Sequence, residues 1–468
     1  MGDFDVVVLG AGSGGYATAL RAAQLGLSVA MIEKDQVGGT CLHRGCIPTK
    51  AILHAAEIAD AARHGAEFGV HTVIERIDLA GVKAYADATV ARLYKGLSGL
   101  VRSRDITVIS GEGRLLPAES AEDPPRVAVG DQVITGRHLV LASGSEARSL
   151  PGLEVDGRRV ITSDHALRLE SLPKSAIVLG GGVIGAEYAS AWRSFGVEVT
   201  IIEALPRLLP NEEPELSAGL ERAFRRRKIT NLTGAPVAEV DAGEHGVRVT
   251  LSTGRAVEAE LLLVAVGRGP RSAGLGYPEA GVELDRGFVT VTERLAASTP
   301  RTYAVGDLVA GLQLAHRGFA HGIFVAEEIA VAEGRPDARP PAPVRDRDIP
   351  KITYCDPEVA SVGLGEEAAR AEYGDAVTIS YDLAGNGRSQ ILRTAGLVKL
   401  VRAPDGPIVG IHLLGSRVGE LIGEAQLITA WEAYPEDVAA AIHAHPTQSE
   451  AIGEAHLALA GKPLHVHG

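Results

Sequence analysis

Residues 4–15 read FDVVVLGAGSGG, and this short stretch decides the fold of the first part of the chain. A run of mostly apolar residues leads straight into glycines whose spacing is typical of a strand–turn–helix unit that binds a dinucleotide. Gly10 allows the tight turn, Gly12 lets the backbone approach a pyrophosphate, and Gly15 permits close packing of the helix on the strand. Backbone N–H groups at the start of the helix would then hold the phosphate charge.

The same unit occurs a second time in the chain. Residues 176–179 read AIVL and lead into another glycine turn, and a second strand at 197–202 follows the intervening helix. The glycines of this second turn are Gly180, Gly182 and Gly185. In each copy the second strand ends in an acid, Glu33 or Glu203, at the distance expected for a residue that binds a ribose hydroxyl. One glycine motif alone would be weak evidence, but two complete copies predict two separate dinucleotide sites.

Glu203 also bears on the choice of nucleotide. Its carboxylate would accept a hydrogen bond from a 2′-hydroxyl and repel a 2′-phosphate, so NAD is expected to bind better than NADP. Arg207 lies four residues further on and leaves some use of NADP open.

A pair of cysteines, Cys41 and Cys46, lies in the stretch GGTCLHRGCIPTK. In a regular helix the axial rise between them would be about 7.5 Å, which exceeds the usual Cα separation of a disulfide. The backbone must therefore be irregular between them, and Gly45 supplies the freedom. Pro48 suits the first turn of a helix, so Cys46 is expected at a helix N-terminus, where the dipole favours a thiolate. We predict a reducible, working disulfide. A metal site is not predicted, because zinc needs three or four ligands and only His43 is near.

The C-terminal stretch HAHPTQSE contains a candidate general base. Dithiol exchange proceeds through thiolates, so it needs a base near the exchanging thiol. His445 titrates in a suitable range, and Glu450 could orient its ring. The alternative is that this histidine-rich end is only exposed, and we expect His443 to be structural.

Composition excludes several classes of function. Aromatic residues make up only 4% of the chain and the formal net charge is −13, which argues against binding nucleic acid or an anionic membrane and permits a basic protein partner. The one basic run, residues 225–228, is expected on a solvated helix face. Three cysteines cannot form a structural disulfide framework, the start lacks a secretory signal, and no apolar run approaches the ~20 residues of a membrane span. The chain is therefore predicted to be cytoplasmic.

These motifs, together with AVGD at 304–307, resemble those of the pyridine nucleotide–disulfide oxidoreductases along nearly the whole chain. The C-terminal HPTxSE motif and LQLAH at 312–316 are similar to the dihydrolipoamide dehydrogenase branch of that family. The resemblance implies an α/β fold with two Rossmann-like domains, one for FAD and one for NAD, and an α+β C-terminal domain that forms a homodimer. The expected boundaries are 1–150 and 274–343 for the FAD domain, 151–273 for the NAD domain, and 344–468 for dimerisation.

The resemblance also implies roles for single residues. Those expected at the cofactors are Gly10, Gly12, Gly15, Glu33 and Asp307 for FAD, and Gly180, Gly182, Gly185, Glu203 and Gly267 for NAD. Lys50 would lie beside the flavin and pair with Glu187. Cys46 would be the thiolate that faces the flavin, and Cys41 the thiol that exchanges with substrate. His445 and Glu450 would serve Cys41 of the partner subunit.

The implied reaction is oxidation of dihydrolipoamide on a lipoyl domain with reduction of NAD⁺. The implied partner is the acyltransferase core of a 2-oxo acid dehydrogenase complex, or else the glycine cleavage system. The alternatives are another flavoprotein disulfide reductase that uses NAD(P)H, or a quinone reductase or transhydrogenase. Two residues depart from the family pattern. Arg44 lies between the cysteines, where we hypothesise that it favours the thiolate, and His321 stands where an acidic residue is usual.

Overall fold

The computed structural model describes residues 3–120, 122–336 and 338–465. Residues 1 and 2, on which the statement about a secretory signal partly rests, and residues 466–468 lie outside these described ranges. The chain packs as two compact units. Unit 1 comprises Met1–Ala51, Ala80–Arg148 and Arg268–Asp346, and unit 2 comprises Ile52–Leu79, Ser149–Gly267 and Arg347–Gly468. The domain boundaries predicted from the sequence stay predictions.

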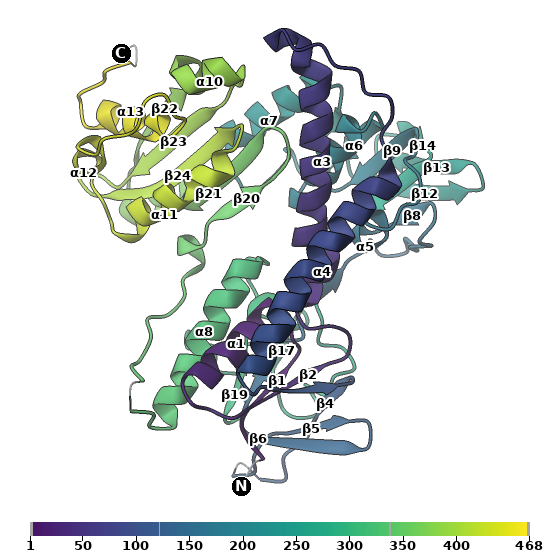
Figure 1. Cartoon of the computed structure of the whole chain (residues 1–468), viewed down its shortest axis with the longest axis vertical. Coiled ribbons are helices and arrows are strands. Elements are labelled where there is room, and N and C mark those ends of the chain that lie inside the picture. The colour runs from purple at the N-terminus through teal and green to yellow at the C-terminus, as the bar shows by residue number, and fades with distance from the viewer. Residues whose placement is uncertain (1–2, 121, 337, 466–468) are drawn as a thin grey trace. The chain divides into compact units, whose positions relative to one another are not determined.

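Unit 1 is built on a mainly parallel sheet (Figure 1). Its strands are β1 (Phe4–Leu9), β2 (Val29–Glu33), β3 (Thr107–Ser110), β4 (Gly113–Leu116), β5 (Arg126–Val129), β6 (Gln132–Leu141) and β19 (Thr302–Ala304). Two short strand pairs lie outside this sheet, β7 (Ser145–Ala147) with β16 (Arg268–Pro270) and β17 (Leu284–Asp285) with β18 (Phe288–Val289). The 3-10 turn η2 (Gly306–Leu308) follows β19. The order is β3-β2-β1-β6-β5-β4, with β19 also paired to β6. Its helices are α1 (Ser13–Gln24), α2 (Gly39–Arg44) and α8 (Ala315–Ala332). Helices α3 (Cys46–His64) and α4 (Leu79–Ser103) have residues in both units.

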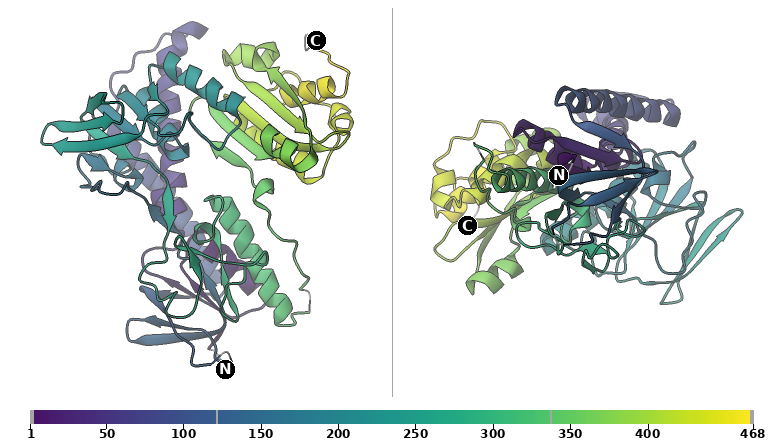
Figure 2. Two further views of the ribbon diagram at one scale, coloured as in Figure 1. Left: turned by 180° about the vertical axis from the view of Figure 1, so that it is seen from behind. Right: turned by 90° about the horizontal axis from the view of Figure 1, so that it is seen from below.

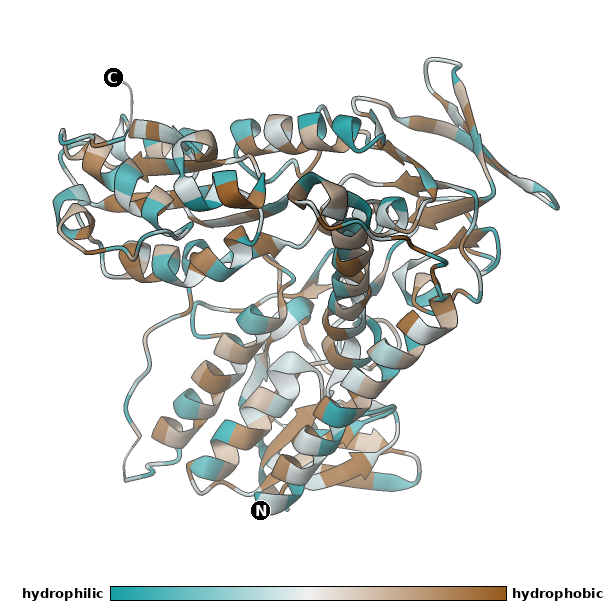
Figure 3. Ribbon diagram, turned by 45° about the horizontal axis from the view of Figure 1, so that its top comes forward, coloured by the Kyte–Doolittle hydropathy of each residue, from teal (hydrophilic) through white to brown (hydrophobic). Residues whose placement is uncertain are grey.

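The alternation of side chains along β1 explains why this strand is apolar throughout. Val6 and Val8 face a core shared with α1 and α8, whereas Val7 and Leu9 face a second core that includes Tyr277. Parallel sheets are covered on both faces, so their strands read as continuous apolar runs. Figure 3 shows this as brown colour along the strands of the sheet.

Unit 2 contains the second glycine turn. Its parallel sheet has the order β11-β10-β9-β15-β8, and a three-stranded antiparallel sheet, β12-β13-β14, packs against one face of it. The elements are β8 (Val160–Ile161), α5 (Ser163–Ala166), β9 (Ser175–Leu179), α6 (Val183–Ser194), β10 (Glu198–Ile202), α7 (Pro214–Arg226), β11 (Thr230–Leu232), β12 (Val237–Gly243), β13 (Gly246–Leu251), β14 (Ala256–Ala259) and β15 (Leu261–Val264).

The C-terminal part of unit 2 is an antiparallel sheet with helices, as expected for an α+β segment (Figures 1 and 2). The sheet has the order β20-β21-β24-β23-β22, and its apolar face packs against α11 and α13. The elements are β20 (Lys351–Thr353), β21 (Glu358–Gly363), α9 (Glu366–Tyr373), β22 (Val377–Asp382), α10 (Gly387–Leu392), β23 (Leu397–Arg402), β24 (Ile408–Gly415), α11 (Ile422–Ala430), α12 (Pro435–Ala439) and α13 (Glu450–Leu459). Within the described ranges, no helix is long and apolar enough to cross a membrane.

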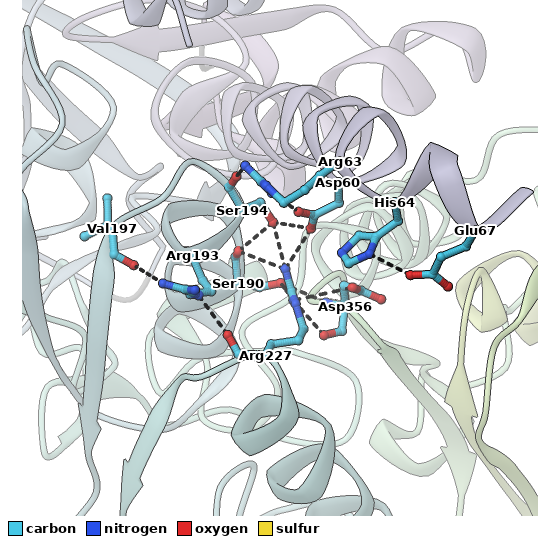
Figure 4. Close-up of polar contacts among 10 residues, drawn as sticks. All are labelled: Asp60, Arg63, His64, Glu67, Ser190, Arg193, Ser194, Val197, Arg227 and Asp356. Carbon is cyan, nitrogen blue, oxygen red and sulfur yellow. Dashed lines mark hydrogen bonds and ion pairs between the residues drawn. The ribbon is translucent and has the colours of Figure 1, made fainter. Parts of the chain in front are cut away.

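The basic run at 225–228 differs from its prediction at one residue. Arg225 and Arg226 are exposed, but Arg227 is largely buried and binds three segments of unit 2. Its guanidinium donates to Asp60 on α3 at 2.9 Å, to Ser190 and Ser194 on α6 at 2.7 Å each, and to the carbonyl of Asp356 at 2.8 Å (Figure 4). A guanidinium has five donors in a fixed fork, which allows it to join several acceptors at once.

Candidate active site

The first glycine turn has the geometry that a bound dinucleotide requires. Gly10 has a φ of +104°, and a Cβ atom there would lie 2.3 Å from the carbonyl oxygen of Ala142. At Gly15 a Cβ would lie 1.9 Å from the carbonyl oxygen of Gly10, so helix and strand touch at this point. Gly12 is different, because a Cβ there would meet no atom within 4 Å. Gly12 is also the N-cap of α1, and no side chain caps this helix start. Its N–H groups can therefore receive a phosphate.

Glu33 is fixed at the end of β2 by the backbone around the turn. One carboxylate oxygen accepts from the N–H of Ala11 at 2.8 Å, and the other accepts from the N–H of Asp35 at 2.9 Å. Each carboxylate oxygen has a second lone pair, so the group can still accept a hydrogen bond from a ribose.

The second turn repeats this geometry. Gly180 has a φ of +109°, a Cβ at Gly185 would lie 1.9 Å from the carbonyl oxygen of Gly180, and Gly182 has open space and is the uncapped start of α6. Glu203 is buried, and it accepts from the N–H of Gly181 at 2.6 Å and from the N–H of Leu205 at 2.8 Å. The donors present at both turns therefore fit a dinucleotide.

Arg207 turns back onto its own loop. Its Nη2 donates to the carbonyl of Pro210 at 2.8 Å. This hydrogen bond engages one end of the guanidinium within its own loop.

The two cysteines lie on consecutive helices. Cys41 is inside α2, Gly45 ends that helix with φ −145° and ψ −109°, and α3 begins at Cys46. The irregular backbone expected at Gly45 and the helix N-terminus expected at Cys46 are both confirmed. The separate helix that carries Cys41 was not predicted.

Contact between the cysteines controls the ionisation of Cys41. Its hydrogen bond to Cys46 raises the pKa of the Cys41 thiol, and burial and the charge of Cys46 act in the same direction. The charge of Lys50 and a hydrogen bond with Ser13 lower it, and the rise prevails. The raised pKa favours a protonated Cys41, and the role of Cys46 as the thiolate of the pair stays a prediction.

The neighbouring cation that acts on Cys41 is Lys50, one turn along α3 from Cys46. Arg44, which was expected to favour the thiolate, pairs with Asp35 at 3.1 Å, and its effect on the cysteines stays a prediction. His43 also turns away, since its Nε2 lies 2.9 Å from the carbonyl oxygen of Val37.

Asp307 lies in η2, just after β19. Its carboxylate accepts from the hydroxyl of Ser145 at 2.6 Å, and that hydroxyl accepts from Nε of Arg268 at 2.8 Å. Sequence reasoning identified Asp307 but missed Ser145 and Arg268. The available signal was their position, since each follows a glycine that lies a few residues after the end of a strand.

Glu187 and Gly267 lie beside the second turn. Glu187 is 3% exposed on α6 and accepts from the N–H of Tyr354 at 3.0 Å. Gly267 follows β15 with a φ of +107° and open space where a Cβ would stand.

In the C-terminal part, His445 and Glu450 form the pair that the sequence predicted. Nδ1 of His445 lies 2.8 Å from Oε1 of Glu450, and the other oxygen of Glu450 accepts from the N–H of Thr447 at 2.8 Å. The side chain of His445 is 77% exposed, so its Nε2 is open to an incoming thiol. His443 instead contacts Glu424 at 2.7 Å and is nearly buried, as expected of a structural residue.

The third cysteine, Cys355, belongs to a hydrophobic core of unit 2. Cys355 is buried, and burial raises the pKa of its thiol well above the usual value. Across the part of the chain that the structure describes, no three His, Cys, Asp or Glu side chains are grouped so that they could hold a metal ion.

Two nucleotide turns, a cysteine pair and an α+β C-terminal part define a class of flavin-dependent disulfide oxidoreductases. The chain belongs to the pyridine nucleotide–disulphide oxidoreductase family, whose main domain matches residues 4–322 and whose dimerisation domain matches residues 349–456. It is an oxidoreductase with FAD and NAD as cofactors, and it forms a homodimer.

Individual relatives narrow the comparison. The chain is 39% identical to the dihydrolipoyl dehydrogenase of Bacillus subtilis, over 99% of both chains. Its structure is similar to LpdA from Mycobacterium tuberculosis, with a TM-score of 0.89 and 28% identity over 97% of this chain and 99% of that one. It is also similar to the HOCl-induced flavoprotein disulfide reductase RclA from Escherichia coli, with a TM-score of 0.82 and 25% identity over 97% and 99% of the two chains. The fold class and cofactors predicted from the sequence are confirmed.

Proposed function

We propose that this protein is a dihydrolipoyl dehydrogenase, which oxidises protein-bound dihydrolipoamide to lipoamide and reduces NAD⁺. The observation that carries the proposal is the Cys41–Cys46 contact close to the first glycine turn. Full-length similarity to dihydrolipoyl dehydrogenases, at 39% identity for the Bacillus subtilis enzyme, selects the substrate from among dithiols.

The cysteines exchange electrons with the substrate in two thiol–disulfide steps. In the oxidised enzyme, a substrate thiolate attacks Sγ of Cys41, the Cys41–Cys46 bond breaks, and Cys46 leaves as a thiolate. The second substrate thiol then attacks the substrate sulfur that is bonded to Cys41, which closes the lipoamide ring and releases Cys41. The substrate has lost two electrons, and the cysteine pair has gained them.

His445 moves the protons of these steps. Its exposed Nε2 accepts a proton from the first substrate thiol and releases it to solvent, and then accepts a proton from the second thiol. Glu450 accepts a hydrogen bond from Nδ1–H and so fixes the tautomer. Cys41 leaves as a thiolate and is reprotonated by His445, which fits the raised pKa of the Cys41 thiol beside the charge of Cys46. In the homodimer, we assign His445 of one subunit to Cys41 of the other.

Bound FAD supplies the electron transfer between the Cys46 thiolate and NAD⁺. The chain contributes binding and orientation. Gly12 and Gly182 give the two pyrophosphates close access to the backbone, and Glu33 and Glu203 hold the riboses.

The partner and the compartment follow from charge and cysteine content. With a net charge of −13, the surface suits docking onto a basic segment of the acyltransferase core of a 2-oxo acid dehydrogenase complex. Binding to that core should weaken as salt is raised, and binding that is insensitive to salt would contradict this assignment. The small number of cysteines, three in 468 residues, supports the cytoplasm.

The test is NADH formation from NAD⁺ and dihydrolipoamide by the purified yellow protein, followed by NADH absorbance. Turnover that requires Cys41 supports the proposal. Bound FAD and a reducible cysteine pair without turnover would leave another flavoprotein disulfide reductase. Turnover of a quinone that survives Cys41→Ser would identify a quinone reductase or transhydrogenase instead.

A further inference from the structure

Two buried polar residues of helix α8 contact the backbone of the turn that carries Asp307. Arg317 is 4% exposed and His321 is 2% exposed, and both lie in unit 1 with the turn. Neither has a place in the dithiol chemistry. Buried polar side chains are costly unless they satisfy other polar groups, so their partners indicate what they do.

Arg317 satisfies the carbonyl groups of the turn. Its Nη2 donates to Ala310 at 2.7 Å, and its Nη1 lies 3.4 Å from the carbonyl oxygen of Gly306 and 3.3 Å from that of Val309. Its Nε pairs with Asp346 at 2.6 Å, which balances the buried charge. The guanidinium therefore holds the backbone carbonyl groups of the segment 306–310 in place.

His321 accepts from an N–H group of the turn, which the guanidinium of Arg317 cannot do because it has no acceptor. The N–H of Gly306 points to Nδ1 of His321 at 3.3 Å. A backbone N–H can only donate, so Nδ1 must carry a lone pair and the ring must be neutral. Burial, followed by the charge of Arg317, lowers the pKa of His321 to about 4, so the ring stays neutral at physiological pH.

Asp307 lies in the same turn, directly after Gly306. Gly306 has a φ of +68°, a left-handed conformation that glycine adopts readily. The carboxylate of Asp307 is then held by Ser145, which Arg268 holds in turn. The Asp307 carboxylate is thus held by a hydroxyl, and the backbone just before Asp307 is held at the N–H of Gly306.

We propose that His321 is a positioning residue for the flavin site, whose neutral ring accepts the Gly306 N–H and thereby sets the direction of the Asp307 carboxylate toward the ribityl chain of FAD. This inference rests on the proposed function, in which FAD is bound, and on the role in binding FAD that the family resemblance implies for Asp307. A lysine could not perform this task, because its ammonium group has donors but no acceptor.

The experiment compares two substitutions of nearly equal shape. The amide oxygen in His321→Asn stands where Nδ1 stood, as many bonds from the backbone, and it can accept from Gly306. His321→Leu has the same branched shape without an acceptor, which leaves a buried N–H unsatisfied. FAD release from each holoenzyme is followed on dilution by the rise of flavin fluorescence. We expect His321→Asn to release FAD at nearly the wild-type rate and His321→Leu to release it roughly tenfold faster.

A double-mutant cycle with Asp307→Asn separates positioning from general structure. If His321 acts through Asp307, His321→Leu should add little to the faster release in the Asp307→Asn background. Equal release from the Asn and Leu variants, or fully additive effects, would overturn the inference. Should His321→Leu not fold, His321→Gln replaces it, since its amide is one methylene longer and out of register, and retention of FAD by that variant at the wild-type rate would also overturn the inference. None of these readouts uses lipoamide, so a failure of dihydrolipoamide turnover in the wild type would reject the proposed function without touching this result.

Discussion

The two glycine turns have the same construction but lead to different chemistry. In the first, the chain after Glu33 returns over the turn: the N–H of Gly38 donates to the carbonyl of Ala11 at 2.8 Å. Gly39, with a φ of +59°, lies so close to Gly12 that a Cβ would stand 2.6 Å from its Cα. Helix α2 begins there and brings Cys41 to the turn.

In the second turn, the returning segment only covers the glycines. The N–H of Leu209 donates to the carbonyl of Gly181 at 2.9 Å, and the side chain of Leu208 packs over Gly181. The chain then continues into α7 without a reactive residue. The scaffold thus supplies two equal nucleotide sites, and a short segment after one acid makes only the first a redox centre.

The largest expected effect tests whether that segment alone carries the dithiol chemistry. Cys41→Ser removes the sulfur that the substrate attacks, and we expect turnover of dihydrolipoamide to fall by roughly a thousandfold or more. Both glycine turns are untouched, so the variant should keep its FAD and still bind NAD⁺. Measurement of NADH formation together with the flavin spectrum checks both statements. Substantial turnover in this variant would break the comparison, because the first turn would then need no cysteine.

The next effect tests whether the two turns are equal as nucleotide sites. A Cβ at Gly12 or Gly182 meets no protein atom within 4 Å, so Gly12→Ala and Gly182→Ala should fold normally. Each methyl group would, however, occupy the place of a pyrophosphate. Overpacking costs about 1–3 kcal/mol, which corresponds to roughly fivefold to 150-fold weaker binding. Gly12→Ala should weaken FAD alone, and Gly182→Ala should raise KM for NAD⁺ alone.

Gly96→Ala is the matched control for this pair. It lies in α4, also has open space for a Cβ, and belongs to neither turn. It should change neither FAD retention nor KM for NAD⁺. If Gly12→Ala altered KM for NAD⁺ while FAD remained bound, the two sites would not be independent.

Local features of the sequence predicted the parts of this site that depend on neighbours along the chain. The strands and helices around Gly10 and Gly180 follow from apolar runs and glycine spacing, and the His445–Glu450 pair follows from a separation of five residues. These contacts form within one element or between adjacent ones. Short-range physics is therefore sufficient to predict them.

The remaining features depend on contacts between distant residues. Arg227 was expected in solvent with its neighbours, but its partner Asp60 is 167 residues away. The contact that orients Asp307 comes from Ser145, 162 residues away. Arg44 pairs with Asp35, a contact that the sequence did not predict. A single sequence shows the charge of each residue but not which partner the fold brings to it.

The smallest expected effect concerns a contrast within the C-terminal part, where His445 faces solvent and His443 does not. The hydrogen bond to Glu424 raises the pKa of His443, against the effect of burial. A histidine whose pKa is raised by folding adds stability at low pH, and this stability is lost as the pH rises through the pKa of the folded state. Glu424 is 35% exposed, so solvent screening limits the pair to about 0.5–1 kcal/mol. Glu424→Gln should therefore lower the midpoint of thermal unfolding by a small amount at acidic pH, and by progressively less as the pH is raised.

Glu450→Gln provides the comparison for that measurement, because its partner His445 is 77% exposed and gains little from pairing. We expect Glu450→Gln to reduce turnover strongly and to leave the thermal midpoint almost unchanged across the same pH range. Glu424→Gln should show the opposite pattern, with a pH-dependent midpoint and nearly normal turnover. Scanning calorimetry and NADH formation on the same two preparations measure both properties. If the two variants behaved alike in either assay, the distinction between a structural and a catalytic histidine–glutamate pair would fail.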